Sequence, residues 1–549
     1  MAAAAVEEGP APTEAPYGEW ESPITAEFIT AAGVGLRKLK TSPVEGKLFW
    51  LESRPEEGGR QVVVAYEPDE AHANERGAVD VIPREHNART RVHEYGGGEF
   101  LVASDNAIIY SNFQDQRLYR AQVRGPDVDV SVLTPPSAYE QDRVFRFADG
   151  VVDEQRNRLI CVREDHTLPA PADVVNTVVA VSLDGSGDMT VLAEGADFYA
   201  APRLSPDGST LAFVSWNHPN MPWDGTTLQV MRLNEPGLPA SAPVIVAGGS
   251  GEGGAPEISV QQAAWSPMGE LYFVSDETGW WNLYKIPLPL ASDATSDLSL
   301  WAASAVNLVP REVDFSGSSP GWGLGQQGYA FAANGNVVAV QGGQTLVVLD
   351  AAGSVLSEHT HADGLPFAFG NVTPGAGDTV YLLGSSPAAA SGIYRWSLAG
   401  DAPAELLASS MKSAMAISPT VISTPERIRF PTRPLPESSI DHAYGLLYLP
   451  RNDNFTAPAG SRPPLLVKAH GGPTSCARTA FNPGIQVRVN MYVWLLLPRK
   501  LAQLCPSPLA PCSRCSRCSR CSREKAPIHS VYVWLSVQTM QLVFAVFAT

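Results

Sequence analysis

Short apolar stretches bounded by turn-forming residues recur along most of the chain. Between Thr41 and Leu407, a turn rich in Gly, Asp, Asn or Pro precedes an apolar strand, which is followed by a loop and a second strand. The unit occurs seven times at intervals of about 55 residues, close to the spacing of propeller blades. The first strands begin near Leu48, Ile108, Leu159, Leu211, Leu271, Val337 and Val380, and the second strands at Gln61, Arg117, Asn176, Thr227, Asn282, Gln344 and Gly392.

Seven such units predict a mainly β protein with a seven-bladed β-propeller. A small twisted sheet cannot bury both faces alone, but sheets packed radially cover one another and leave only short edges. The turns at residues 205–208 and 265–269 occupy the same place in two units, which supports a true repeat. A large β-sandwich or two separate β-domains are the less favoured alternatives.

The pattern changes after the seventh unit. The stretches ERIRFPT from Glu426 and AYGLLYLP from Ala443 alternate as half-buried strands do, whereas residues 465–469 are nearly all apolar, as in a strand covered on both faces. That strand ends in the sequence His-Gly-Gly-Pro. We therefore expect an α/β domain to begin here.

The charge of the chain limits its partners. The 549 residues include 39 Lys and Arg against 57 Asp and Glu, a net charge of −18. So acidic a surface argues against nucleic acid or an anionic membrane as the main partner. The charge is uneven, because residues 487–549 carry eight basic side chains and one acidic one, while residues 1–486 carry a net −25.

Cysteine usage and the N-terminus bear on the compartment. Only Cys161 and Cys476 precede residue 487, which is typical of a reducing environment. No basic residue precedes Arg37 and the first residues hold no apolar core, so neither a signal peptide nor a transit peptide is predicted. We therefore expect a cytoplasmic protein.

Several stretches carry a family resemblance. They are YGEWESPITAE from Tyr17, FWLESRPEEGGR from Phe49, TRVHEYGGGEF from Thr90, YSNFQDQRLYR from Tyr110, LICVREDH from Leu159, LSPDGSTLAFVSWNHPNMPWD from Leu204 and KAHGGPT from Lys468. Together they resemble the prolyl oligopeptidase family of serine peptidases, closest to its acylaminoacyl-peptidase and dipeptidyl-peptidase-like branch. The resemblance implies a seven-bladed propeller that caps an α/β-hydrolase domain, which in this chain is C-terminally truncated.

The resemblance and the repeats divide the chain into five expected parts. Residues 1–16 are predicted to be a disordered N-terminus, and residues 17–40 a segment that packs with the hydrolase side. The propeller is expected over residues 41–410 and the incomplete start of the α/β-hydrolase domain over residues 424–486. Residues 487–549 are a low-complexity tail without family resemblance.

The catalytic triad implied by the family is missing. A Ser–Asp–His triad needs a nucleophile on a tight strand-to-helix turn, a base beside it and a carboxylate that orients the base. In the family all three follow the His-Gly-Gly-Pro loop, but residues 487–549 hold no G-x-S-x-G, no Asp and only His529. A literal G-x-S-x-G at residues 317–321 lies in a Ser, Gly and Pro loop that cannot begin a helix, so we interpret it as a propeller loop. No catalytic residue and no peptidase activity are predicted.

Two groups of residues are candidates for binding. The resemblance implies that His470, Gly471 and Gly472 build or brace an oxyanion hole, the alternative being a tight turn after a buried strand. A second group of polar residues is predicted either to contact substrate in the propeller channel or, as is more usual for charges at strand ends, to pair with each other and with turn amides. This group comprises His93, Glu94, Tyr95, Glu164 and Asp165.

Metal, cofactor and membrane sites are not expected. His359 and His361 are predicted to lie in a solvated loop, and the Cys-Ser-Arg repeat at residues 512–523 lacks the paired spacing of a zinc motif. Residues 531–549 are uncharged, but their two Gln side chains disfavour a membrane anchor. The repeated tail is best interpreted as translated intron or an error in the gene model.

These observations lead to one functional prediction and one alternative. The chain is predicted to be a fragment of a serine peptidase that releases acyl-amino acids or dipeptides from short peptides, the partners of intact relatives, and to be inactive as written. The alternative is a propeller-based protein-binding module without catalysis. Nucleic acid is not an expected partner, and the oligomeric state stays open.

Overall fold

The computed structural model describes most of the chain up to residue 497. It covers residues 11–497 apart from 23, 32, 72, 125–126, 135–143, 169, 255, 288–296, 316–320, 322, 413–416, 432–441, 470–476 and 490–492, together with 533–535 and 542–544. The described residues divide into two compact units. One contains those of 33–385 and 391–412, and the other those of 1–32, 386–390 and 413–549.

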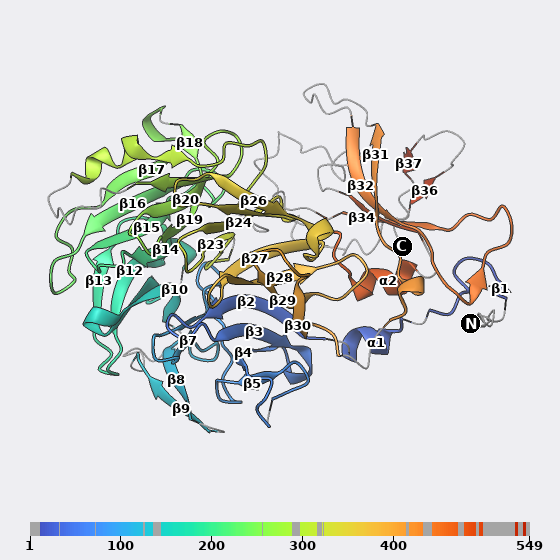
Figure 1. Cartoon of the computed structure of the whole chain (residues 1–549), viewed down its shortest axis with the longest axis horizontal. Helices are drawn as coiled ribbons and strands as arrows, with labels where there is room; N and C mark the ends of the chain where they lie inside the picture. The colour runs from blue at the N-terminus through green and yellow to red at the C-terminus, as the bar shows by residue number, and fades with distance from the viewer. Residues whose placement is uncertain are drawn as a thin grey trace, which may run out of the picture. The chain divides into compact units, whose positions relative to one another are not determined.

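Seven antiparallel sheets follow one another along the larger unit, from blue to yellow in Figure 1. The first three sheets consist of β2 (Gly35–Thr41), β3 (Leu48–Arg54), β4 (Arg60–Tyr66) and β5 (Ala78–Asp80); β6 (Phe100–Val102), β7 (Ile108–Ser111), β8 (Leu118–Arg124) and β9 (Asp127–Val132); and β10 (Phe145–Asp153), β11 (Arg158–Asp165), β12 (Val175–Ser182) and β13 (Met189–Ala193).

The remaining four sheets continue the order. They consist of β14 (Phe198–Leu204), β15 (Thr210–Trp216), β16 (Thr227–Arg232), β17 (Val244–Ser250) and β18 (Glu257–Ile258); β19 (Val260–Trp265), β20 (Leu271–Ser275), β21 (Asn282–Ile286) and β22 (Val306–Asn307); β23 (Tyr329–Phe331), β24 (Val337–Gln341), β25 (Thr345–Leu349) and β26 (Val355–His359); and β27 (Ala368–Pro374), β28 (Thr379–Ser385), β29 (Gly392–Ser397) and β30 (Glu405–Ser409). Short 3₁₀ turns lie at Pro55–Glu57, Glu154–Arg156, Pro171–Asp173, Glu252–Gly254, Leu298–Leu300, Ala302–Ser304, His361–Asp363 and Pro419–Val421.

The sheets form a closed ring, which confirms the predicted seven-bladed propeller. The first strands of neighbouring sheets contact each other, as β10 does with β6 and β14. Between sheets five and six, the hydroxyl of Tyr329 on β23 donates to the carbonyl of Gln262 on β19 (2.6 Å). Thr41 donates its hydroxyl to the carbonyl of Pro374 (2.9 Å), and Thr373 donates to the carbonyl of Leu39 (3.2 Å), so the last sheet bonds to the first. Because each sheet is built from consecutive strands, the ring closes by packing and side-chain hydrogen bonds and not by exchange of a strand.

Apolar side chains fill the space between successive sheets. Separate buried clusters lie between sheets two and three, three and four, four and five, five and six, and six and seven, and one large cluster joins sheets seven, one and two. Trp50 and Trp396 are among the fully buried side chains. The strands predicted from the repeat are the second and third of each sheet. Several of them, such as β3, β15 and β20, are buried on both faces and therefore read as apolar runs.

The inner strands carry a repeated irregularity. The pairing register shifts between Arg37 and Lys40, between Ala148 and Val151, between Ala200 and Arg203, and between Gln261 and Ala264. At each shift one residue has a positive φ, namely Lys38 (52°), Asp149 (46°), Ala201 (48°) and Gln262 (56°). A bulge of this kind bends the strand and re-aims a side chain, so the same position in four sheets presents its side chain differently from a regular strand.

The first sheet begins earlier than the repeat suggested. Strand β2 starts at Gly35, so residues 35–40, expected in the N-terminal segment, pair with β3 in the propeller. Its sequence, GLRKLKT, contains charged side chains and therefore lacks the apolar run by which the other strands were predicted. The strand was missed because its polar side chains belong to the inner surface of the ring.

The smaller unit contains a four-stranded mixed sheet. Its order is β31 (Glu426–Pro431), β32 (His442–Tyr448), β35 (Val493–Leu497) and β34 (Leu465–Ala469), and only β34 and β35 are parallel. Helix α2 (Pro483–Val489) contributes Ile485 and Val489 to a buried cluster with Leu446 and Tyr448 of β32. Other elements of this unit are α1 (Ala26–Ala31), the parallel pair β1 (Thr13–Glu14) and β33 (Phe455–Thr456), and the antiparallel pair β36 (Val533–Leu535) and β37 (Leu542–Phe544).

Two further features of this unit bear on the sequence predictions. The side chain of Gln486 fixes α2 through two buried hydrogen bonds, because it accepts from the amide of Ser423 and donates to the carbonyl of the same residue (both 2.9 Å). Strand β35 lies within residues 487–549, the tail that showed no family resemblance. Among the described helices, none is long and apolar enough to cross a membrane.

Candidate functional site

A buried ion pair joins two neighbouring inner strands. Arg203 on β14 donates through Nη2 to Oδ1 of Asp149 on β10 (2.9 Å), and the amide of Ala201 donates to Oδ2 of the same carboxylate (2.9 Å). Burial alone raises the pKa of Asp149, but the guanidinium of Arg203 and the Ala201 amide outweigh it and hold the pKa below its usual range. Asp149 is therefore a charged group that bonds sheets three and four together.

Two glycine-rich segments meet inside the ring. The amide of Leu324, between sheets five and six, donates to the carbonyl of Gly96, between sheets one and two (2.9 Å), and Gly97 forms a parallel bridge with Leu324. Lys38 of β2 donates through Nζ to the carbonyl of Leu324 (2.7 Å). Because these segments precede sheets two and six, which are not neighbours, their contact crosses the central opening of the propeller.

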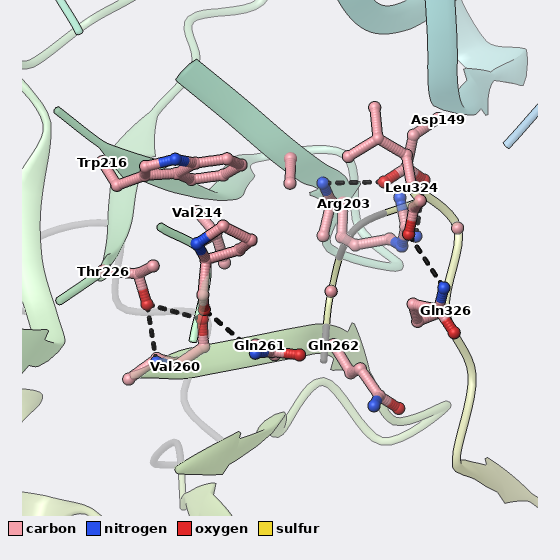
Figure 2. A pocket seen from close by; sticks show the side chains of 16 residues that line it. Asp149, Arg203, Val214, Trp216, Thr226, Val260, Gln261, Gln262, Leu324 and Gln326 are labelled. Carbon is pink, nitrogen blue, oxygen red and sulfur yellow. Dashed lines mark hydrogen bonds and ion pairs between the residues drawn. The ribbon is translucent and has the colours of Figure 1, made fainter. Parts of the chain in front are cut away.

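Two cavities share the ion pair as part of their walls. The smaller is about 40 Å³ and is drawn in Figure 2, where Trp216 lies on one side and the Asp149–Arg203 pair on another. The larger is about 520 Å³ and also includes Gln262 and Gln326 in its lining. The small one has room for about one water molecule. The large one falls in the range of about 300–1,000 Å³ that ligand pockets occupy, so it is the candidate binding site.

The candidates from the sequence gather partly into one cluster. Glu164 on β11 is buried and accepts the amide of His93 through Oε1 (2.6 Å), while its Oε2 lies 2.9 Å from Nε2 of His166. Arg146 on β10 lies 3.6 Å from Oε2 of Glu164 and donates to Oε1 of Glu94 (2.6 Å). The structure thus brings His93, Glu94 and Glu164 together around one arginine.

The ring of His93 lies in an aromatic environment. It packs edge-on against Phe198 (centroids 5.2 Å apart) and Trp216 (5.5 Å). Burial lowers the pKa of His93, against the opposing charges of Glu164 and Asp149, which favours the neutral ring. Its Nε2 is buried and makes no hydrogen bond with any described residue.

The structure also describes two other predicted residues. Asp165 accepts the amide (2.9 Å) and the hydroxyl (2.6 Å) of Thr167, and Tyr95 is exposed. His470, Gly471 and Gly472, and most of the G-x-S-x-G loop at 317–321, lie outside the described residues.

The histidines considered for a metal have other neighbours. Nε2 of His359 lies 2.9 Å from the hydroxyl of Ser357, and Nδ1 of His361 lies 2.9 Å from the carbonyl of Leu365. Where the chain is described, no group of three or more His, Cys, Asp or Glu side chains is arranged to hold a metal ion.

Sequence reasoning missed the residues around the large cavity. Lys40, Asp149, Arg203 and Gln262 all lie on bulged inner strands, and each is a polar residue inside an otherwise strand-like stretch. That local break in the apolar pattern, repeated in several blades, is the signal that points to them.

Replacement of Glu164 by glutamine is expected to lower the free energy of unfolding by about 2 kcal/mol. The substitution keeps an acceptor for the His93 amide but removes the negative charge beside Arg146 and His166. Urea unfolding measures the effect. Asp165→Asn is the matched control and is expected to change stability by less than about 0.5 kcal/mol. An unchanged stability with weakened peptide binding would instead assign Glu164 to substrate contact.

Comparisons with known proteins were made by sequence and by structure. No protein-family model matches the chain, and no curated protein sequence does. Among solved structures, puromycin hydrolase is similar with a TM-score of 0.75 and 28% identity, over 88% of this chain and 69% of that one. A puromycin-hydrolyzing peptidase from Mycobacterium tuberculosis has a TM-score of 0.72 with the same identity and coverage. The match to prolyl oligopeptidase B from Galerina marginata spans 85% of this chain and 62% of that one, with 11% identity and a TM-score of 0.57. At that identity the similarity shows the fold alone.

These similarities and the closed ring of seven sheets identify the fold as that of the prolyl oligopeptidase family of serine peptidases, as the motifs predicted. Within that class, the chain is similar to puromycin hydrolase along most of its own length.

Proposed function

We propose that this chain is a short-peptide-binding protein of the prolyl oligopeptidase type, in which residues 424–486 are the opening of the α/β-hydrolase domain. The observation that carries the proposal is the similarity to puromycin hydrolase over 88% of the chain at 28% identity. Strands β34 and β35 are parallel, and helix α2 lies between them in the chain, so the three form a β-α-β unit. Such units are typical of α/β domains. In this proposal His470, Gly471 and Gly472 form its glycine-rich turn.

We further propose that the chain as its sequence stands does not cleave peptides. Acyl transfer needs the nucleophile, base and orienting carboxylate together, and residues 487–549 contain neither a G-x-S-x-G nor an aspartate. Without a nucleophile, an oxyanion hole has no tetrahedral intermediate to stabilise. Peptide binding by the propeller is then the property that the chain retains.

The proposal also includes a cytoplasmic location. Cys161 is the one cysteine among the described residues, and it is buried. Burial raises the pKa of its thiol, which keeps the sulfur protonated and unreactive. A thiol of this kind behaves as a small apolar side chain in the core between sheets two and three.

Labelling with a fluorophosphonate probe tests the inactive assignment. We expect no labelling of the purified chain and no release of p-nitroaniline from aminoacyl p-nitroanilides, with puromycin hydrolase as the positive control. Ser319→Ala is the matched variant, because Ser319 is the central serine of the literal G-x-S-x-G. Strong labelling that Ser319→Ala does not remove would contradict the proposal by revealing another nucleophile, and labelling that it does remove would assign that role to Ser319.

The alternative is a propeller that binds a protein and not a short peptide. The cavity of about 520 Å³ favours the peptide, because a cavity of that size takes a small ligand and not a folded surface. Equilibrium dialysis with labelled dipeptides and tripeptides separates the two. Saturable binding supports the proposal, and no binding at millimolar peptide supports the alternative.

A further inference from the structure

The lining of the large cavity includes a lysine with no anionic partner among the described residues. Lys40 is on the bulge of β2 and lines the cavity, and its Nζ makes no hydrogen bond or ion pair with any described residue. Lys38, two residues earlier, differs because its Nζ donates to the carbonyls of Leu324 (2.7 Å) and Gly325 (3.3 Å). A buried or half-buried ammonium without a partner is costly, and proteins usually pair such a group.

The charges that line the cavity do not cancel. Arg203 and Asp149 neutralise each other, and Arg203 also donates through Nη1 to the carbonyl of Pro202 (2.8 Å). Both oxygens of Asp149 are occupied, one by Arg203 and one by the amide of Ala201. Lys40 therefore leaves one unbalanced positive charge on the lining. Two charged residues outside the lining also act on Lys40: the positive charge of Lys38 lowers its pKa and the negative charge of Glu99 raises it.

The rest of the lining suits an organic body. Aromatic side chains of Phe100, Trp265, Tyr329 and Phe331 contribute to the walls, together with the amide side chains of Gln262 and Gln326. Apolar walls with a few polar groups are the usual make-up of a small-molecule site. One net positive charge matches a monovalent anion better than a doubly charged phosphate.

We propose that the cavity inside the propeller ring binds a small organic carboxylate with an apolar or aromatic body, and that Lys40 is the residue that pairs with its charge. The carboxylate can belong to a free acid or to the C-terminus of a short peptide, and the peptide source rests on the proposed function. No triad residue takes part, so this site operates whether or not the chain cleaves peptides.

The electrostatics of Lys40 make binding depend on pH. Burial and the positive charges of Arg203 and Lys38 lower its pKa to about 8, while Asp149 and Glu99 act in the opposite direction. Below that pH the ammonium is protonated and attracts a carboxylate. As the pH rises through about 8 the proton is lost, so the affinity for the anion is expected to fall.

Calorimetric titration at low salt tests the proposal with N-acetyl-L-phenylalanine and its amide. We expect the acid to bind at least about tenfold more tightly than the amide at pH 6.5, by the strength of a charge-assisted hydrogen bond, and to lose that advantage at pH 9.5. Gly-Gly-Phe and its amide form the peptide arm. Tighter binding of the tripeptide acid identifies a peptide terminus as the source, and tighter binding of the acetylated amino acid identifies a free acid.

The variant Lys40→Met tests whether the acids bind at this site or are attracted to the protein non-specifically. It is expected to weaken binding of the acids at least about tenfold while leaving the amides unchanged, and to fold, because methionine fills similar space without a charge to bury. Lys412→Met is the matched control, since Lys412 is an exposed lysine that pairs with Glu56. Thermal unfolding of both variants checks their folding.

Three results would overturn the proposal. Equal binding of acid and amide by the unmodified chain would show that the ligand's charge does not contribute to binding. Retained acid binding in folded Lys40→Met would show that Lys40 does not pair with the carboxylate. Absence of binding by all four probes at 10 mM would also reject the site. A failure of this site is distinguishable from a failure of the proposed function. Equal binding of Gly-Gly-Phe and its amide would keep peptide binding but reject the carboxylate site, whereas binding of N-acetyl-L-phenylalanine without the tripeptide would keep the site but reject peptide binding.

Discussion

Replacing Asp149 by alanine is expected to lower the free energy of unfolding by about 3–5 kcal/mol. The carboxylate is almost fully buried and accepts from Arg203 on the neighbouring sheet. Removal leaves the guanidinium in a half-buried cavity wall without its counter-charge, and leaves the Ala201 amide without an acceptor. Because the pair joins sheets three and four, the loss acts on the ring and not on one blade. Guanidinium chloride unfolding measures it.

A double-mutant cycle tests the cause of that loss. Arg203→Met added to Asp149→Ala removes the unpaired charge, so the double variant is expected to be more stable than Asp149→Ala alone. Glu405→Ala is the surface control, because Glu405 pairs with Arg395 where both side chains are about half exposed, and it is expected to cost less than about 1 kcal/mol. Equal costs for Asp149→Ala and Glu405→Ala would show that burial of the Asp149 pair has no energetic consequence.

Replacing Gly97 by alanine is expected to lower the free energy of unfolding by about 3 kcal/mol. Gly97 has a φ of +102°, and a Cβ there would lie 2.3 Å from the amide nitrogen and 2.4 Å from the carbonyl oxygen of Leu324. Backbone atoms cannot rotate away as a side chain can, so the two segments that cross the ring must move apart. Overpacking of this kind costs about 1–3 kcal/mol, and the left-handed backbone adds about 1–2 kcal/mol for a residue with a Cβ.

Gly58→Ala is the matched control for Gly97→Ala. Gly58 also has a positive φ (+69°), but a Cβ there meets no atom within 4 Å. It is therefore expected to show only the backbone cost of about 1–2 kcal/mol. Thermal unfolding of both variants isolates the steric part. If the two variants lose the same stability, the close approach of Gly97 to Leu324 carries no cost.

The blade number and the central strands could be predicted because each contains its own signal. Strands β3 and β4 are covered on both faces and appear as apolar runs between turns. In other sheets, as in β28, buried residues alternate with partly exposed ones, which is also a strand pattern. The outermost strands gave no such signal, as in β9, whose sequence DVDVSV is mostly exposed. Inner strands such as β2 and β14 were obscured by their bulges, because a shift of register breaks the alternation on which a strand prediction depends.

The candidate site was predictable only where its residues share a motif. His93 and Glu94 are neighbours in the stretch that carries the family resemblance, and Glu164 lies in a second such stretch, so all three were singled out. That Glu164 accepts the amide of His93 depends on the packing of sheets two and three, which no local pattern specifies. The sequence likewise marked the run Gly96, Gly97 and Gly98 without showing that its partner is Leu324.

The sequence by itself determined seven repeated units, the family resemblance and the change of pattern after the last blade, because each depends on the order of residues within a short window. Only the tertiary structure decided which charges are paired. Asp149 meets Arg203, and Lys40 lines a cavity where it pairs with no carboxylate of the described residues, because closing the ring sets the distances between strands that are far apart in the chain. Electrostatic and steric energies depend on those distances and not on sequence separation, so the interior of the ring becomes visible only once the ring is formed.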